Sequence, residues 1–245
     1  MHITIIIPAY NEQNRIQSTL EIYNNFFLQK YTETGLGYEL LVVINGTTDA
    51  TKSIVQSLQQ TMPYLRMLEI KQGGKGLALT HGFKNALERP TDLIGFVDAD
   101  QATSPQIYYQ LVTQINNYDG IIASRYMPGA LVVPPRPWIK RWGSKLFFES
   151  LVRWLFGLHY YDTQCGAKLF KRAVIEKIAP NLHVRQWAFD VELLYVCKQL
   201  GFTITETPTI WRDQAGSKLR ILHAGLPMLS SLITMRWHYW FSPLN

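Results

Sequence analysis

Short apolar segments alternate with longer amphipathic ones through the first half of the chain. The apolar segments are rich in Ile, Val and Leu, as buried strands of a parallel sheet are, and they cover residues 3–8, 38–45, 65–70, 93–97 and 120–123. Helical periodicity separates them at about 15–27, 50–60 and 77–88, and a fourth helix is expected to begin at Pro105. Strands that alternate with helices predict right-handed β-α-β units and a mostly parallel sheet, which is typical of nucleotide-binding domains.

The second half of the chain differs in character. Residues 127–137 contain four prolines, which predicts a loop or a mobile lid. Two helical segments combine a wide face of Trp, Phe and Leu with basic residues, at 138–156 and 222–239. Between them we expect a loop and a strand over 162–170, a helix within 187–200 and a short strand over 203–207.

Composition narrows the class of protein. The chain has 245 residues, of which 47% are hydrophobic and 17% charged, so it is globular and long enough for one large domain or two small ones. Its net charge of +6 favours anionic partners: nucleotide, nucleic acid or anionic membrane. Cys165 and Cys197 lack metal-like spacing, and we expect a reduced compartment. No segment has the roughly 20 apolar residues of a membrane span, and the strand-like run from residue 3 argues against a signal peptide.

Two carboxylates follow one of these strands directly. Residues 93–97 run into Asp98 and Asp100, at the edge where open α/β sheets bind ligands. Residues two apart in an extended segment point the same way, and the two charges repel unless a cation lies between them. Their oxygens suit Mg²⁺ or Mn²⁺. For the pair alone a plainer explanation is favoured, in which Asp98 caps the next helix and Asp100 is a solvated loop residue. Together with the motifs in the rest of the chain, a metal site becomes the favoured explanation.

Two further residues fit a nucleotide at the same edge. Glu12 follows the first strand and can accept hydrogen bonds from a ribose or base, although a carboxylate that complements the first turn of a helix has the same position. Lys75 lies in the flexible loop Gly73-Gly74-Lys75-Gly76, where the backbone can approach a phosphate and the ammonium can neutralise it. For this loop alone, a solvated turn lysine is an equal alternative.

Eight motifs extend in a fixed order over nearly the whole chain. They are Pro8-Ala9-Tyr10-Asn11-Glu12, Gly46-Thr47-Thr48-Asp49-Ala50-Thr51, Gly74-Lys75-Gly76, Val97-Asp98-Ala99-Asp100, Ser124-Arg125-Tyr126, residues 162–170, residues 187–194 and Gly216-Ser217-Lys218-Leu219. In these motifs the chain resembles family 2 glycosyltransferases of the polyprenyl-phosphate type, dolichyl-phosphate glucosyltransferases most and dolichyl-phosphate mannose synthases next.

The resemblance implies an α/β glycosyltransferase A fold. Such a fold has a mostly parallel Rossmann-like sheet flanked by helices, and here we expect amphipathic interfacial helices in the C-terminal half. We expect a single domain over 1–245, with a nucleotide-sugar-binding half at 1–126 and an acceptor and membrane-facing half at 127–245.

The resemblance also implies roles for individual residues. Asp98 and Asp100 would hold a metal, Mg²⁺ or Mn²⁺, that bridges the donor diphosphate, and Asp190 and Asp100 are the catalytic candidates. Candidates for binding the nucleotide sugar are Pro8, Tyr10, Glu12, Asn45, Asp49, Lys75, Asp98 and Gln164. The candidates for binding the acceptor phosphate are Arg125, Arg141, Arg212 and Lys218, because arginine side chains suit phosphate. Each of these four cations, taken alone, is more simply a solvated surface residue.

Three motifs depart from the family pattern. The family's Asp-Asp pair after the second strand, which helps to recognise base and ribose, is Ile44-Asn45 here, and only the Asn45 side chain can form hydrogen bonds. Mannose synthases of the group place a metal-binding Gln where this chain has Ala102, which favours the glucosyltransferase branch, and Gln101 could substitute as a ligand. The family's Gly-Phe-Lys is Gly166-Ala167-Lys168, with a smaller side chain near the site.

The expected reaction is an inverting transfer of a hexose, glucose before others, from a nucleotide sugar to a dolichyl or undecaprenyl phosphate. UDP-glucose is the favoured donor and GDP-mannose the second choice. The acceptor phosphate is mostly ionised near neutral pH, so we expect Asp190 to orient the sugar or acceptor more than to remove a proton. A competing role for Asp190 is an N-cap of the following helix.

The two aromatic, basic helices favour a membrane surface as a partner, although they would also pack as ordinary core. We expect a cytoplasmic enzyme that is peripheral at the cytoplasmic face of a membrane. Nucleic acid is not an expected partner, because the sequence lacks a basic stripe with stacking aromatics on a strand. Two alternatives stay open: a transferase for a soluble or saccharide acceptor, and a non-catalytic nucleotide binder at a membrane surface. Ile44-Asn45 motivates the second alternative, and the intact Asp98 and Asp100 oppose it.

Overall fold

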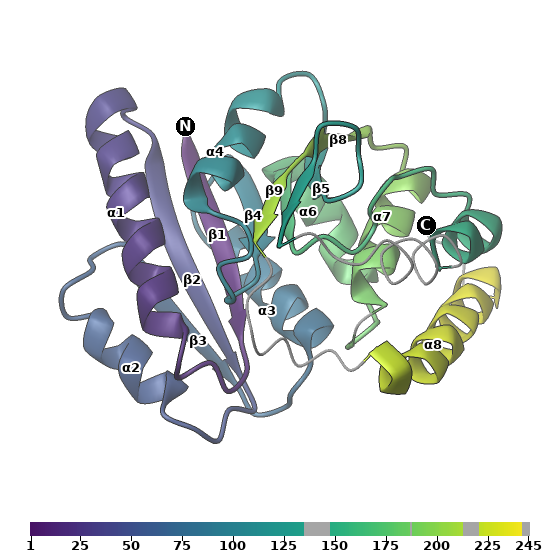
Figure 1. Cartoon of the computed structure of the whole chain (residues 1–245), viewed down its shortest axis with the longest axis horizontal. Helices are drawn as coiled ribbons and strands as arrows, with labels where there is room; N and C mark the ends of the chain where they lie inside the picture. Colours follow the sequence, from purple (N-terminus) through teal and green to yellow (C-terminus); the bar gives the residue numbers. More distant parts are fainter. Residues whose placement is uncertain (135–147, 187, 213–220, 242–245) are drawn as a thin grey trace.

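The computed structural model describes residues 1–134, 148–186, 188–212 and 221–241. Their central element is a seven-stranded sheet with the order β3-β2-β1-β4-β7-β5-β8 (Figure 1). Only β7 runs antiparallel to its neighbours β4 and β5, so the expected mostly parallel sheet is confirmed. The strands are β1 (His2–Ala9), β2 (Gly37–Asn45), β3 (Leu65–Ile70), β4 (Leu93–Val97), β5 (Gly120–Ser124), β7 (Ala167–Lys171) and β8 (Ile204–Pro208).

Helices cover both faces of the sheet, because its central strands are apolar on both sides. One buried cluster joins one face of the sheet to α1 (Ile16–Thr34), α2 (Thr51–Leu58) and α4 (Pro105–Gln114). A second cluster joins the other face to α3 (Lys75–Leu87), α6 (Arg172–Ile178), the short 3₁₀ helix η1 (Ala179–Asn181) and α7 (Phe189–Gln199).

The last helix, α8 (Ile221–Phe241), packs against α7 at one end of the molecule (yellow in Figure 1). The Tyr239 ring lies 5.3 Å from the Tyr195 ring, measured between centroids. Within the described ranges, no helix combines the length and the apolarity that are needed to cross a membrane.

Three features differ from the sequence-based expectations. Helix α1 continues to Thr34, where Gly35 ends it in the left-handed conformation at φ 72. Helix α3 begins at Lys75 and not at Leu77, so Lys75 belongs to a helix and the prediction of a flexible loop at this residue is wrong.

The third difference lies within the expected loop over 127–137. It contains a strand, β6 (Leu131–Val133), which pairs in parallel with β9 (Ile210–Arg212). The middle residues of the two strands, Val132 and Trp211, are buried, and a β-branched and an aromatic side chain in this alternation stabilise the pairing. Of the helix expected over 138–156, residues 148–156 are helical, and 135–147 lie outside the described residues.

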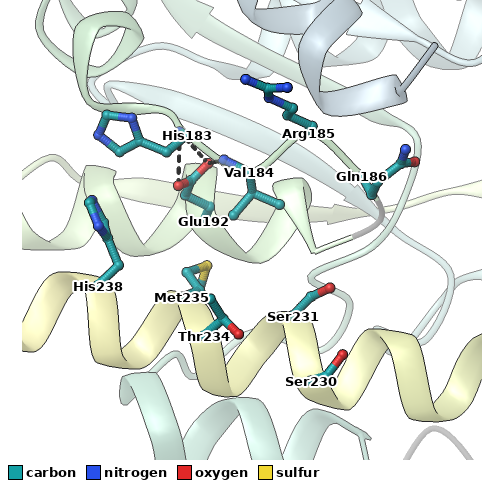
Figure 2. Close-up of a pocket in the computed structure, with 10 residues that line it drawn as sticks. All are labelled: His183, Val184, Arg185, Gln186, Glu192, Ser230, Ser231, Thr234, Met235 and His238. Carbon is teal, nitrogen blue, oxygen red and sulfur yellow. Dashed lines mark hydrogen bonds between the residues drawn. The ribbon is translucent and has the colours of Figure 1, made fainter. Parts of the chain in front are cut away.

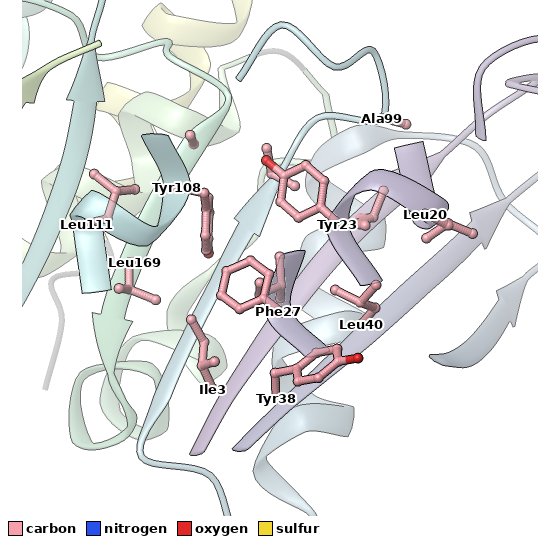
Figure 3. Close-up of a cluster of buried hydrophobic side chains, with 14 of the residues drawn as sticks. Ile3, Leu20, Tyr23, Phe27, Tyr38, Leu40, Ala99, Tyr108, Leu111 and Leu169 are labelled. Atoms are coloured by element: carbon pink, nitrogen blue, oxygen red, sulfur yellow. The ribbon is translucent and has the colours of Figure 1, made fainter. Parts of the chain in front are cut away.

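Aromatic rings fill the centre of the first cluster (Figure 3). The Phe27 ring of α1 lies 6.2 Å from Tyr23, 5.8 Å from Tyr38 and 6.5 Å from Tyr108 between centroids. The Tyr23 hydroxyl donates to the Thr103 carbonyl at 2.9 Å. This cluster therefore ties α1 to the segment that follows β4, where the paired carboxylates lie.

We expect Phe27→Ala to lower the free energy of unfolding by about 3–5 kcal/mol, because it leaves a cavity among packed rings. The matched control is Leu28→Ala on the same helix, where the side chain is 42% exposed and the change should be within about 0.5 kcal/mol. Chemical denaturation of both variants measures the difference. Equal losses for the two variants would contradict this assignment of the core.

Candidate active site

The carboxyl ends of β1, β2 and β4 lie at one edge of the sheet, because these strands pair in parallel. Strand β7 runs the other way, so its first residue, Ala167, pairs with Val97, the last residue of β4. The Asp98 N–H donates to the Gly166 carbonyl at 3.1 Å. The segment before β7 thus lies directly beside the predicted carboxylates.

Four charged side chains form a continuous series at this edge, which we call the ion chain: Asp98, Lys75, Asp190 and Lys168. Lys75 Nζ lies 2.8 Å from Asp98 Oδ1 and 3.5 Å from Asp190 Oδ2. Lys168 Nζ lies 2.7 Å from Asp190 Oδ1 and donates to the Cys165 carbonyl at 2.7 Å. Anions and cations alternate in equal number, so the ion chain has no net charge.

At Asp190 and Lys75 of the ion chain, burial and the neighbouring charges shift the pKa in opposite directions. Burial alone would raise the pKa of Asp190, but Lys168 and Lys75 together hold that pKa below its ordinary value. Burial would lower the pKa of Lys75, but Asp190 and Asp98 outweigh it and raise that pKa. Both side chains are therefore ionised at neutral pH. Asp190 lies in the first turn of α7, whose N-cap is Ala188, so the alternative that Asp190 is the N-cap is wrong.

Asp98 and Asp100 fit a divalent cation. Burial, and then the charge of Asp98, raise the pKa of Asp100, and a cation between the two carboxylates would relieve their repulsion. The Thr19 hydroxyl donates to the Ala99 carbonyl at 2.8 Å, which fixes the backbone between them. The next helix is capped by Ser104, so the alternative that Asp98 caps it is wrong.

The described residues supply few ligands for such a cation. Among the described residues, no group of three or more His, Cys, Asp or Glu side chains is placed to hold a metal. Gln101 Nε2 donates to Ser18 Oγ at 2.6 Å, so the suggested substitute ligand is engaged with α1. Two carboxylates would therefore hold the cation together with oxygens of a donor and water, as is common for Mg²⁺ at phosphates.

Asn45 lies at the end of β2, beside the first turn of α3. Its Nδ2 donates to the Gly74 carbonyl at 3.2 Å. Its Oδ1 is buried and has no hydrogen-bond partner among the described residues. A buried acceptor without a donor is unfavourable, so Asn45 is suited to accept a hydrogen bond from a ligand.

The other predicted nucleotide residues lie in the loops after β1 and β2. Asp49 accepts the backbone N–H groups of Gln13 and Thr51, at 3.2 and 2.9 Å. The Glu12 N–H donates to Thr51 Oγ1 at 2.8 Å, and its carboxylate pairs with Arg15. These contacts tie the two loops together.

Three further predicted residues lie in or next to β1 and before β7. Pro8 lies within β1 and pairs with Val43 of β2. Tyr10, just beyond β1, is 49% exposed. The Gln164 N–H donates to Asp162 Oδ1 at 3.3 Å, so Gln164 lies in the segment before β7.

The predicted acceptor residues divide into two groups. Arg125 is held by the buried Asp162, with Nε at 2.7 Å and Nη2 at 2.9 Å from its carboxylate, and stacks over Trp211. Arg212 ends β9, and its N–H donates to the Ala102 carbonyl at 3.0 Å, beside Asp100. Arg141 and Lys218 lie outside the described residues.

Sequence reasoning did not assign a role to Lys168 or Asp162. Apart from the terminal Lys171, Lys168 is the one charged residue of the strand Ala167–Lys171. A charge inside an otherwise apolar strand was the signal that could have indicated a role. Asp162 is buried against Arg125. Its role depends on a partner distant in the sequence, which no local pattern indicates.

A hollow of about 380 Å³ lies between α8 and residues 183–186 (Figure 2). The Glu192 carboxylate of α7 accepts the N–H groups of His183 and Val184, at 3.0 and 2.9 Å. On the other side of this segment, the Arg185 carbonyl accepts the Leu77 N–H of α3 at 3.3 Å. The segment therefore separates the hollow from the turn that presents Lys75.

Comparison with known proteins identifies the family. The model of glycosyl transferase family 2 matches residues 4–179. The chain belongs to glycosyl transferase family 2. A dolichyl-phosphate beta-glucosyltransferase of Drosophila melanogaster is 34% identical over 93% of this chain and 72% of its own. That of Dictyostelium discoideum is 31% identical over 98% of this chain and 75% of its own.

Solved structures show the same fold. Glucosyl-3-phosphoglycerate synthase from Mycobacterium tuberculosis, in complex with Mn²⁺, UDP-glucose and phosphoglyceric acid, aligns with a TM-score of 0.69 at 16% identity, over 96% of this chain and 79% of its own. The expected family, glycosyltransferase A fold and hexosyltransferase class are confirmed.

A substitution at Gly166 tests whether Asp98 belongs to the binding site of this glycosyltransferase. A Cβ at position 166 would overlap Asp98 Oδ2, so we expect Gly166→Ala to displace that carboxylate. Affinity for UDP with Mn²⁺ should fall by about tenfold or more, measured by titration calorimetry. Gln110→Ala is the control, because Gln110 is exposed on α4 and is not one of the candidate site residues. Unchanged affinity in Gly166→Ala would contradict the placement of Asp98 in the site.

Proposed function

We propose that this glycosyltransferase moves glucose from UDP-glucose to the phosphate of a polyprenyl lipid, with inversion at the anomeric carbon. A phosphate oxygen of the lipid forms the new bond to that carbon. The bond from the carbon to the β-phosphate oxygen of UDP breaks, and UDP leaves. The observation that carries the proposal is the ion chain beside Asp100, in a protein whose relatives at 31% and 34% identity are dolichyl-phosphate beta-glucosyltransferases.

The donor side rests on Lys75, Asn45 and the paired carboxylates. A lysine at the first position of α3 is disfavoured by the helix dipole, but it suits a diphosphate that approaches the helix N-terminus. Asn45 Oδ1, buried without a partner among the described residues, can accept the imide N–H of uracil. Mg²⁺ or Mn²⁺ on Asp98 and Asp100 would supply positive charge for the leaving diphosphate.

Asp190 has the properties of an orienting group. Its pKa lies below the ordinary value because two lysines outweigh its burial, so it is a weak base. The acceptor needs little base, since the second pKa of a phosphate monoester is about 6. Asp190 is therefore proposed to accept hydrogen bonds from the sugar or to position the acceptor.

Cations must offset the repulsion between donor and acceptor phosphates. Arg212 is connected to the paired carboxylates through its backbone, because its N–H donates to the carbonyl of Ala102, two residues after Asp100. Arg125, Arg141 and Lys218 remain proposed for the same role. The proposed division of labour is a donor half at 1–126 and an acceptor half at 127–245.

A polyprenyl lipid is held in a membrane, and α8 has a face suited to one. Leu232, Met235 and Tyr239 of α8 are buried. The opposite face has side chains 66% exposed at Trp237 and 69% exposed at Trp240. Such a face, with Arg236 stacked on Trp240 at 5.3 Å, is typical of helices that lie in the headgroup region.

The proposed location is the cytoplasmic face of a membrane, with the enzyme bound peripherally. Trp154, in the helix over 148–156, is 80% exposed and would add to the contact. Both cysteines are free and buried, which agrees with a reducing compartment.

Purified enzyme with labelled UDP-glucose, polyprenyl phosphate in detergent and Mn²⁺ or Mg²⁺ should place label in the lipid phase, and EDTA should prevent it. Asp98→Asn should lower the rate by at least about a hundredfold. Asp92→Asn, at the opposite end of β4 with its side chain 63% exposed, should leave it unchanged. GDP-mannose and UDP-N-acetylglucosamine tested in parallel decide the donor. Transfer to a soluble saccharide without lipid would overturn the proposed acceptor.

Trp237→Ala combined with Trp240→Ala should weaken binding to vesicles that contain anionic lipid by roughly tenfold or more, because two exposed indoles no longer enter the interface. Co-sedimentation measures this binding. Tyr118→Ala, at a side chain 45% exposed outside α8, should bind as the wild type does. Vesicle binding that survives the double substitution would place the membrane contact elsewhere.

A further inference from the structure

Exposure decreases steadily along the ion chain. The side chains are 30% exposed at Asp98, 16% at Lys75, 5% at Asp190 and 0% at Lys168. A substrate can reach the Asp98 end, whereas Lys168 is closed off from it. Lys168 can therefore act on the reaction only indirectly, through the groups it contacts, and its charged partner is Asp190.

Lys168 occupies a position that the sheet would normally fill with an apolar side chain. Strand β7 pairs it with Phe96 of β4 and Ile122 of β5, and both belong to a buried hydrophobic cluster. A buried ammonium is unfavourable unless it is paired and hydrogen-bonded, and an apolar residue often serves stability as well or better. Packing therefore gives no reason for a lysine at this position.

Lys75 has two sets of partners that compete. In the structure it pairs with Asp98 and Asp190, and under the proposed function it must also face the donor diphosphate. If Lys75 turns to the diphosphate, Asp190 loses one of its two cations. A carboxylate with 5% exposure that had no other cation would then take up a proton.

We propose that Lys168 is the fixed counter-ion of Asp190, a positioning residue that keeps this carboxylate charged and in place while Lys75 turns to the donor. The proposal rests on the proposed function for what Lys75 faces. Among the residues that the structure describes, the charged side chains that contact Asp190 are Lys168 from β7 and Lys75 from α3. Glu192, the other acid in the first turn of α7, is bonded instead to the N–H groups of His183 and Val184.

Lys168 has two consequences for the reaction. The carboxylate of Asp190 has one oxygen on Lys168 and the other toward Lys75, so the pair with Lys168 still orients it once Lys75 turns away. Because this inner pair is not exposed, it persists when the outer members of the ion chain exchange partners. Asp190 then remains a hydrogen-bond acceptor throughout the transfer and does not become an acid.

The first test is the titration of Asp190, followed by carboxyl ¹³C NMR and assigned by comparison with Asp190→Asn. Replacing Lys168 by Met keeps a side chain of similar length without charge. The midpoint should rise by about 1–3 pH units, the range that an opposite charge within about 4–6 Å provides. Lys168→Gln, which keeps a hydrogen-bond donor without charge, serves as the second variant if the Met variant does not fold.

The second test is a double-mutant cycle on kcat for the transfer to lipid. Lys168→Met should move the acid limb of the pH profile to higher pH, because Asp190 takes up a proton more readily. In an Asp190→Asn background the same substitution should change kcat by less than about twofold, since no coupled charge is left. Melting temperatures of all variants record their stability.

Two results would overturn the proposal: an unchanged titration midpoint in the variants, or an effect of Lys168→Met that persists in full in the Asp190→Asn background. The second result is what a purely structural lysine would give. The titration uses protein without substrate, so it is independent of the proposed function. A wild-type enzyme that transfers no glucose to lipid phosphate would refute that function and leave the titration to decide on Lys168.

Discussion

Buried carboxylates that have to stay charged constrain much of this structure. Asp190 and Asp162 are both almost fully buried, and each is held below its ordinary pKa, against its own burial, by cations from other elements. Asp190 has Lys168 of β7, and Asp162 has Arg125 at the end of β5. Both pairs exist because β7 lies between β4 and β5. The antiparallel strand is thus an electrostatic as well as a topological feature of the site.

The hydrophobic pattern predicted the parallel part of the sheet, because β1 to β5 are short apolar segments separated by helical periodicity. The direction and place of β7 did not follow from it. An apolar strand has the same local sequence whether it pairs parallel or antiparallel, and the partners of Ala167–Lys171 are Val97 and its neighbours, far away in the chain. The strand β6 was missed because prolines surround it, and its pairing with β9 depends on the burial of Trp211.

In the candidate site, too, the sequence predicted single residues but not the contacts between them. Asp98, Lys75 and Asp190 were predicted one at a time, from residue type and family likeness, and the structure joins them by charge. Lys75 was expected in a loop, because three glycines surround it. Gly74 is instead the N-cap of the helix, at φ 142, a conformation that glycine adopts readily. The contact between Leu77 and Arg185 then fixes the first turn, and no local signal predicts that contact.

The segment over 183–186 connects the two surfaces that the proposed reaction needs. The Tyr239 hydroxyl of α8 donates to Glu192 at 2.9 Å, and Glu192 accepts the backbone of His183 and Val184. The next carbonyl along, that of Arg185, bonds to the turn of α3 that presents Lys75. A transferase that joins a soluble donor to a lipid must place a membrane-facing helix at a fixed distance from its donor site. Hydrogen bonds through one short segment provide that connection, while Trp237 and Trp240 of α8 stay exposed for the proposed contact with a lipid surface.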